Sequence, residues 1–313
     1  MKRYVLVPIL AAAAMAIYTA PANAQATRTW VSGVGNDANP CSRTAPCKTF
    51  AGAISKTAAN GEINCLDPGG FGAVTITKNI TIDCEGTMGS ILAASSNGVN
   101  VNGANIVVNL RNLSIDGAGS GLIGVNFITG AQVNLHNVSI FGFKAGSALG
   151  VKFSPNTANS VLLVTNSSIF SNGIVPSTGG GIGVQPAVGG TAFVTIKNSS
   201  IDFNTNAVAY NSTSGAITAT LRDSTLGSNR AGVVTAGGNT INAMVDRTAI
   251  TNTLGTGITS GSAASTVRIS SSVITGNTTG VATAAGGVLL SYGNNSIDGN
   301  GTDGTPIPGV GLD

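Results

Sequence analysis

The sequence predicts an all-β fold, a parallel β-helix in which short strands wind into a stack of similar coils. Two observations predict this fold, namely the composition and an internal repeat. Only 9% of the 313 residues are charged, 44 are Gly, and the aliphatic residues are regularly placed. This composition is typical of many short strands joined by tight turns, and it argues against a disordered chain.

The repeat is clearest in "VTIKNSSIDFN" at 194–204 and is echoed by "VNLRNLSIDGA" at 108–118. Aliphatic and polar residues alternate in both copies, which places the aliphatic side chains on one face of a strand. The final aliphatic residue recurs every 23 to 32 residues, at Ile115, Ile140, Ile169, Ile201, Leu226, Ile250, Ile274 and Ile297. A period of about 24 residues suits three short strands per coil, with coils stacked about 4.8 Å apart. A leucine-rich repeat has a similar period but needs a Leu- and Asn-framed consensus that this chain lacks.

Asn recurs at two corners of the predicted coils. Three residues before the anchor stand Asn112, Asn137, Asn166 and Asn198, and three residues after it stand Asn172, Asn204, Asn229, Asn277 and Asn300. Asn suits tight corners because it tolerates a left-handed backbone and its side chain bonds locally. We expect the Asn side chains of successive coils to form hydrogen-bonded ladders.

Residues 1–24 have the pattern of a cleavable signal peptide. Lys2 and Arg3 precede an apolar run, and Ala22 and Ala24 supply the small residues of a cleavage site. The chain is therefore expected in the periplasm or the extracellular space, with no membrane-spanning segment after cleavage. Without Lys2 and Arg3, 13 basic residues stand against 12 acidic ones, so nothing points to nucleic acid as a partner.

The remaining chain divides into three parts: an N-terminal cap at 25–62, the β-helix at 63–300 and a capping tail at 301–313. An open β-helix needs covers because its end coils expose unpaired strand edges. The segment "CKTFAGAISKTAANG" at 47–61 predicts a short cap helix, because its apolar residues follow a helical period up to Gly61. These apolar residues are Phe50, Ala53, Ile54 and Ala58.

Four cysteines, all in the first third of the chain, predict two disulfides in an exported protein. Of the three possible pairings, Cys41–Cys47 with Cys65–Cys84 is favoured. The first pair closes a short loop, and "EINCLD" and "TIDCEG" look like equivalent strands of adjacent coils. A zinc site is less expected, because the spacing lacks a C-x-x-C pattern and the one His lies far away. No cofactor or metal is expected.

The segment "TWVSGVGNDANPCSRTAPCKTFAGAI" at 29–54 resembles the N-terminal segment of right-handed parallel β-helix proteins of the pectate-lyase-like superfamily. The matching residues are Trp30, Val31, Ser32, Gly35, Asp37, Asn39, Pro40, Pro46, Lys48 and Thr49. The repeats from about residue 75 to 300 are similar to the coils of that superfamily. The resemblance implies a right-handed β-helix of about ten coils. It does not fix the function, because this fold carries lyases, hydrolases, adhesins and non-enzymatic domains.

The acidic residues do not form a catalytic pattern in the sequence. Asp116, Asp202 and Asp298 follow the anchor but lie three coils or more apart, about 14 Å at the coil spacing. A glycosidase needs two carboxyl groups about 5–9.5 Å apart. No oxygen-rich calcium cluster is evident either. The sequence therefore counts against glycan cleavage.

One outward polar stripe, four residues before the anchor, supplies the candidate glycan-binding residues Arg111, His136, Lys197, Arg222 and Asp246. They are expected to stack along the helix axis and to bind an acidic glycan, with the loops at 154–159 and 186–190 as walls. The alternative, which we favour, is a solvated face in which Arg222 pairs with Asp246, worth under ~1 kcal/mol.

The sequence therefore predicts an exported, non-catalytic protein with a structural or glycan-binding role in the envelope or extracellular space, where polysaccharide would be its partner. The alternative is a polysaccharide lyase or glycoside hydrolase that acts on an acidic glycan. Its atypical site would lie along Arg111, His136, Lys197 and Arg222.

Overall fold

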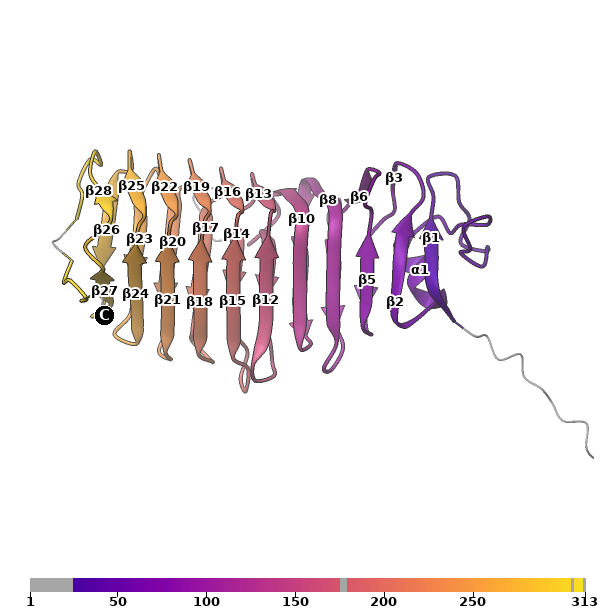
Figure 1. Cartoon of the computed structure of the whole chain (residues 1–313), viewed down its shortest axis with the longest axis horizontal. Helices are drawn as coiled ribbons and strands as arrows, with labels where there is room; N and C mark the ends of the chain where they lie inside the picture. The colour runs from indigo at the N-terminus through magenta and orange to yellow at the C-terminus, as the bar shows by residue number, and fades with distance from the viewer. Residues whose placement is uncertain (1–24, 175–178, 305–306, 312–313) are drawn as a thin grey trace, which may run out of the picture.

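The described residues form an elongated parallel β-solenoid of about nine coils (Figure 1). The computed structural model describes residues 25–174, 179–304 and 307–311, so the expected signal peptide at 1–24 lies outside the described residues. Strands of successive coils pair in parallel, which confirms the predicted all-β fold. Within these ranges, no helix is long and apolar enough to cross a membrane.

Each coil contributes strands to three faces. Face A consists of β1 (Ala26–Val31), β2 (Thr57–Cys65), β5 (Ile80–Asp83), the first parts of β8 (Val107–Gly121) and β10 (Gln132–Phe143), β12 (Ser160–Thr165), β15 (Ala192–Lys197), β18 (Ile217–Arg222), β21 (Ile241–Asp246), β24 (Ser265–Ser270) and β27 (Val288–Ser291). Face B consists of β3 (Gly69–Gly70), β6 (Gly89–Leu92), the second parts of β8 and β10, β13 (Ser168–Phe170), β16 (Ser200–Asp202), β19 (Thr225–Gly227), β22 (Ala249–Thr251), β25 (Val273–Thr275) and β28 (Ser296–Ile297). Because β8 and β10 continue round the corner, faces A and B join into one hydrogen-bonded sheet.

Face C is a separate sheet with one strand from each of nine coils. Its strands are β4 (Val74–Ile76), β7 (Asn97–Asn102), β9 (Ile123–Thr129), β11 (Leu149–Phe153), β14 (Gly180–Val184), β17 (Asn206–Asn211), β20 (Ala231–Ala236), β23 (Thr256–Ser260) and β26 (Thr279–Thr283).

The anchor aliphatics form one continuous interior column. Ile140 pairs with Ile169 and Ile169 with Ile201, and Leu226 pairs with Ile250 further along the axis. All of these side chains are fully buried. Burial of each contributes about 1.5–3 kcal/mol. This gain exists only in the stack, because each coil covers the interior of the next.

The corner between faces A and B requires a left-handed backbone. The φ angles are 56° at Asn112, 52° at Asn137 and Asn166, 50° at Asn198 and Asp223, 44° at Arg247 and 48° at Ser271. Asn and Asp adopt this conformation more readily than other residues with a side chain. Arg247 and Ser271 adopt it as well, so the stacking of the coils fixes the corner whatever residue stands there.

The N-terminal cap contains one short helix, α1 (Phe50–Lys56), which is shorter than expected. Thr57 is already extended and begins β2, so Ala58 lies in a strand. The helix ends early because the next residues form β2. The backbone groups of β2 are used in pairing with β1 and β5, so they are not available to continue the helix. At the other end of α1, the hydroxyl of Thr49 accepts the N–H of Gly52 at 2.9 Å.

Asp37 fastens the preceding loop to the start of α1. Its Oδ1 accepts the N–H groups of Lys48 and Thr49, both at 2.9 Å, and its Oδ2 accepts the Thr49 hydroxyl at 2.8 Å. Burial alone would raise the pKa of this carboxyl. The hydrogen bonds from Thr49 and Lys48, with the charge of Lys56, outweigh burial and hold the Asp37 pKa below its ordinary value.

Two disulfides, Cys41–Cys47 and Cys65–Cys84, join the pairs that the sequence favours. The first closes the loop beside β1. The second ties the first two coils together, because the register of β2 and β5 places Cys65 over Cys84. At the opposite end, Thr302 pairs with Thr279 and Gly309 with Ser291, so part of the tail lies against the last coil.

Candidate functional site

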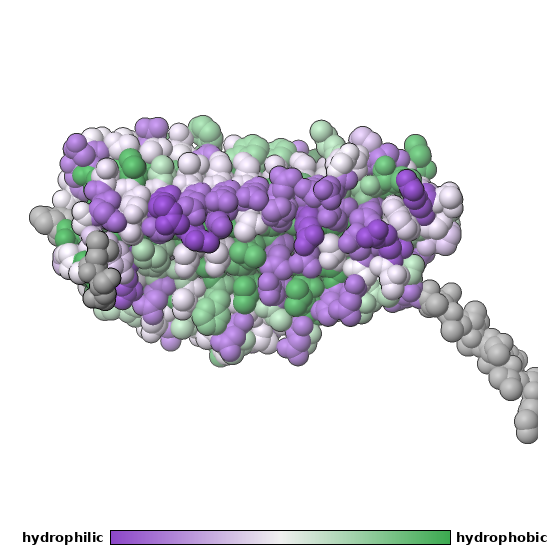
Figure 2. All heavy atoms as spheres, in the orientation of Figure 1, coloured by the Kyte–Doolittle hydropathy of each residue, from purple (hydrophilic) through white to green (hydrophobic). Residues whose placement is uncertain are grey.

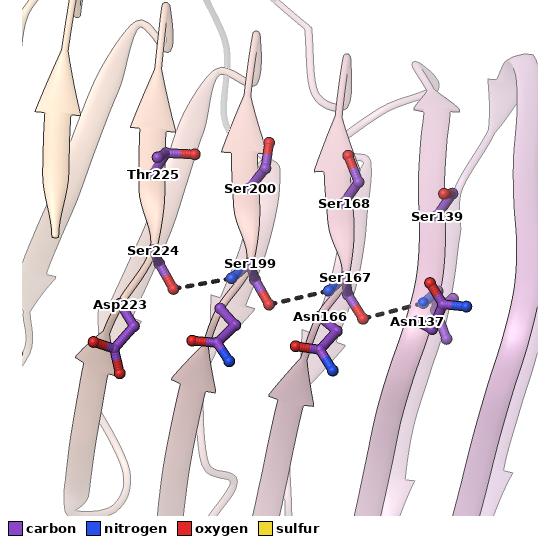
Figure 3. Close-up of a pocket in the computed structure, with 12 residues that line it drawn as sticks. Asn137, Ser139, Asn166, Ser167, Ser168, Ser199, Ser200, Asp223, Ser224 and Thr225 are labelled. Carbon is purple, nitrogen blue, oxygen red and sulfur yellow. Dashed lines mark hydrogen bonds between the residues drawn. The ribbon is translucent and has the colours of Figure 1, made fainter.

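A shallow groove, here called the axial groove, runs across four coils at the corner between faces A and B (Figure 3). Its volume is about 550 Å³. Three rows line it, and each coil gives one residue to every row. The corner row is Asn137, Asn166, Asn198 and Asp223, the floor row is Val138, Ser167, Ser199 and Ser224, and the rim row is Ser139, Ser168, Ser200 and Thr225.

From Ser167 onward the floor row is a buried ladder of hydroxyl groups, and Val138 donates its backbone N–H to the first of them at 3.1 Å (Figure 3). Ser167 donates its backbone N–H to the Ser199 hydroxyl at 3.2 Å, and Ser199 donates in the same way to Ser224 at 3.1 Å. Each of these hydroxyls also donates to the carbonyl two residues earlier, at 2.7–2.9 Å. The floor hydroxyl protons are therefore committed, so a ligand in the groove would have to bond to groups of the corner and rim rows.

The corner row is a ladder only in the first coils. Asn137 donates to Asn112 at 2.6 Å, and Asn112 donates to Asp83 at 2.7 Å. In the described part of the chain, Asn166 and Asn198 make no side-chain hydrogen bond, so the ladder expected through them does not continue. From Ser167 onward, the floor-row hydroxyls link successive coils. The exposed amides of Asn166 and Asn198 therefore remain open to solvent.

The second Asn set lies inside the solenoid at the corner between faces B and C. Asn204 donates to Ile169 O at 2.9 Å and Asn229 Oδ1 at 3.2 Å, and its own Oδ1 accepts the Asn172 N–H at 3.0 Å. Asn277 and Asn300 bond likewise further along. These side chains are buried or part-buried within the coils, so they stabilise the corner rather than face a ligand.

All five candidate glycan-binding residues of the sequence fall in one row, here called the charged row. Strand pairing places Arg111, His136, Thr165, Lys197, Arg222 and Asp246 side by side on successive strands of face A. Each stands one residue before the corner, so the row borders the axial groove. Figure 2 shows hydrophilic residues gathered along the long axis on this side of the molecule.

The prediction of a surface ion pair between Arg222 and Asp246 is wrong. Arg247 holds Asp246 at 2.5 Å, while Arg222 lies nearest Asp223, at 3.9 Å. The left-handed corner explains this, because it turns Arg247 back over the ends of the neighbouring strands. His136 contacts Thr165 through Nδ1 at 2.9 Å. No ion pair of Lys197 is present in the described residues.

The carboxylates of the groove are engaged by other groups. Arg247 grips Asp223 with two hydrogen bonds, at 2.7 and 3.3 Å. This hydrogen bonding and the charges of Arg247, Arg222 and Lys197 hold the Asp223 pKa below its ordinary value. Asp202 accepts the Gly227 N–H at 2.6 Å and also the Ser200 hydroxyl. An ionised, paired Asp223 is unsuited to donate a proton as a general acid.

The loops at 154–159 and 186–190 do not wall this groove. They follow strands of face C and lead into β12 and β15, so they lie at the start of face A. The residues that line the groove lie at the other end of β12 and β15, where the chain turns toward β13 and β16; Figure 1 shows the course of these strands. Instead, Phe141 and Phe170 stand beyond the rim row with stacked rings, 4.9 Å between centroids and 10° between planes.

Sequence reasoning missed the floor row and the Phe pair. Both carry a signal, because Ser167, Ser199 and Ser224 follow the corner residue in their coils, and Phe141 and Phe170 follow the anchor. Among the described residues, no group of three or more His, Cys, Asp or Glu side chains could hold a metal ion.

No protein-family model matches the sequence, and a comparison with curated proteins finds no match. The structure of pectate lyase Pel9A is similar, with a TM-score of 0.57 and 14% identity over 84% of this chain and 74% of that one. This chain therefore has a β-helix fold similar to that of this pectate lyase. A GH136 lacto-N-biosidase from Eubacterium ramulus aligns less well with this β-helix protein, with a TM-score of 0.47 and 12% identity over 91% of this chain and 68% of that one. At these identities the likeness concerns the fold alone.

Proposed function

We propose that this β-helix protein is an exported, non-catalytic glycan-binding protein that holds an extended acidic polysaccharide along the axial groove. Two disulfides suit an oxidising compartment, and the N-terminal sequence suits export. The single observation that carries the proposal is the open pair of amides at Asn166 and Asn198 in the axial groove, with Lys197 directly before Asn198 in the adjoining charged row.

The repeat supports a polymeric ligand. Successive coils lie about 4.8 Å apart, which is close to the length that one sugar adds to an extended glycan. Three of the four coils offer a corner amide, and each of the four places a rim hydroxyl on the other side of the groove, although the Ser200 hydroxyl is bonded to Asp202. A chain lying along the axis would therefore meet similar polar groups at successive sugars.

Charge favours an acidic glycan over a neutral one. Lys197 lies at the middle of the charged row without an ion-pair partner among the described residues, while the carboxylates of Asp223 and Asp246 are held by Arg247. A carboxylate on the glycan would find Lys197 as a charge-assisted donor, an interaction worth about 1.5–3 kcal/mol.

The test is binding of pectate, the substrate named for the similar lyase, measured by calorimetry and by affinity electrophoresis. Lys197→Gln should weaken binding about tenfold or more. Asn166→Gly with Asn198→Gly removes both amides while Gly keeps the left-handed corner, and it should weaken binding similarly. Lys152→Gln on face C and the exposed Asn242→Ala on face A are matched controls and should bind normally.

The lyase alternative is tested in the same samples. If the wild type produces the absorbance of unsaturated sugar ends and Lys197→Gln does not, the protein cleaves the glycan and the non-catalytic proposal is wrong. If the groove variants bind pectate as tightly as the wild type, the axial groove is not the binding site.

A further inference from the structure

A second cavity lies at the N-terminal end, between β1, the loop before α1 and the last turn of α1. Its volume is about 780 Å³, within the range of about 300–1,000 Å³ found for small-ligand sites. Trp30 and Pro40 supply apolar surface in it, and Arg28, Asn39 and Lys56 supply polar surface. We call it the Trp30 cleft.

The walls of the Trp30 cleft are fixed by covalent and polar links. The Cys41–Cys47 disulfide holds the chain directly after Pro40. The ammonium group of Lys56 donates to the carbonyls of Asp37 and Asn39, which ties the loop before α1 to that helix. A site whose walls are already in place loses less entropy when a ligand binds.

The backbone of β1 faces the cleft with a free edge. Trp30 donates its N–H to Cys41 O at 2.8 Å and accepts from Cys47 N–H at 3.0 Å, so its backbone groups point away from β2. The backbone N–H and C=O of Arg28, two residues earlier, point to the same side, because the direction of these groups alternates from one residue of a strand to the next. Within the described chain, no loop residue bonds to the outward N–H and C=O of Arg28.

The side chains beside this edge suit an acidic sugar. The indole of Trp30 is half-exposed and offers an apolar face for the C–H groups of a sugar ring. Arg28 is exposed and uses one nitrogen to bind Glu62 at 3.0 Å, which leaves most of its five donors for a carboxylate. Lys56 adds positive charge nearby while its donors hold the loop.

We propose that the Trp30 cleft binds a single uronic acid unit, with the sugar ring against Trp30 and its carboxylate on Arg28. This inference rests on the proposed function for its class of ligand, and it adds a second site several coils away from the axial groove. An added peptide strand fits less well. The free edge covers only 26–28, because the loop already occupies Trp30 and Ser32.

The chain has one Trp, so fluorescence of the purified exported protein, excited at wavelengths that Trp absorbs and Tyr does not, reports on this cleft alone. The experiment titrates the protein with trigalacturonate and with the neutral trimer of galactose, while calorimetry counts sites. Trigalacturonate should shift the Trp30 emission saturably and bind at least tenfold more tightly than the neutral trimer. Arg28→Gln should weaken binding measured by the emission response about tenfold or more. Glu62→Gln removes the negative charge beside Arg28 but keeps an acceptor for the Asn64 amide, and it should retain the response.

The two sites are separated by their variants. Lys197→Gln should leave the Trp30 response unchanged and lower only the groove affinity seen by calorimetry. If the emission does not change at saturating trigalacturonate, or if both trimers bind equally, the cleft proposal is overturned while groove binding stands. If the emission responds but Lys197→Gln binds pectate normally, the cleft proposal stands and the groove proposal fails.

Discussion

The backbone N–H of Ser167 donates to the side-chain hydroxyl of Ser199, one coil further along the axis, at 3.2 Å. The same hydroxyl donates to the carbonyl of Lys197 at 2.9 Å. Because Lys197 belongs to the charged row, this bond fixes the strand end that carries a side chain beside the groove. The corner is thus held by buried polar groups, and the residues next to them are free to face solvent.

Ser199→Ala should lower the free energy of unfolding by about 1–3 kcal/mol, because it leaves the buried Ser167 N–H without its acceptor. The midpoint of thermal or urea unfolding measures this change. Ser214→Ala, at an exposed position of a turn, is the control and should change stability by less than about 0.5 kcal/mol. Equal effects of the two variants would show that the floor row does not hold the corner.

Asn204→Ala should cost about 2–3 kcal/mol or more, because four hydrogen bonds at a buried corner are lost. Asn198→Gly, at the exposed corner, removes no side-chain hydrogen bond seen in the described residues and keeps the left-handed backbone. It should therefore cost under about 1 kcal/mol. Urea unfolding of both variants checks the order, and the reverse order would contradict the division into a structural and an open Asn set.

Ser271→Asn should stabilise the protein by up to about 1 kcal/mol. Ser271 has a φ of 48°, a conformation that Asn adopts more readily. Ser271→Val should destabilise by more than that, since a β-branched residue fits this region poorly. The difference in unfolding midpoint between the two variants is the measurement. If the Asn and Val variants had the same unfolding midpoint, the backbone at residue 271 would not be left-handed as described.

The cap should weaken in acid because of Asp37. Its pKa is lower in the folded protein than in the unfolded chain, so ionised Asp37 stabilises the fold. This stabilisation is present above the ordinary Asp pKa of about 3.9 and is lost as the pH falls through the lower folded value. Asp37→Asn should therefore be less stable than wild type near neutral pH, and the gap should shrink in acid. A gap independent of pH would mean that the charge of Asp37 contributes nothing.

Much of the fold follows from periodicity, because it records which residues face inward. The column from Ile140 through Ile169 to Ile201 follows from the spacing of the anchors, since parallel coils of similar length must stack in register. The disulfide between Cys65 and Cys84 follows in the same way from equivalent positions in adjacent coils.

The site was less accessible to sequence reasoning. Register places Arg222 beside Asp246, but it does not say that Arg247, one residue past the corner, turns back to take the carboxylate. Periodicity likewise predicts the Asn corner. It does not show that a serine hydroxyl, rather than an Asn side chain, links Ser167 to the next coil. The Trp30 cleft depends on how a loop crosses the end of a strand, which no repeat encodes.

The most direct test of glycan binding is a crystal structure of the protein with a bound oligogalacturonate. We expect an intact sugar chain along the axial groove, with the amides of Asn166 and Asn198 in contact with it and one of its carboxylates bound to Lys197. A chain bound only on face C, or a cleaved product with an unsaturated end in the groove, would contradict it.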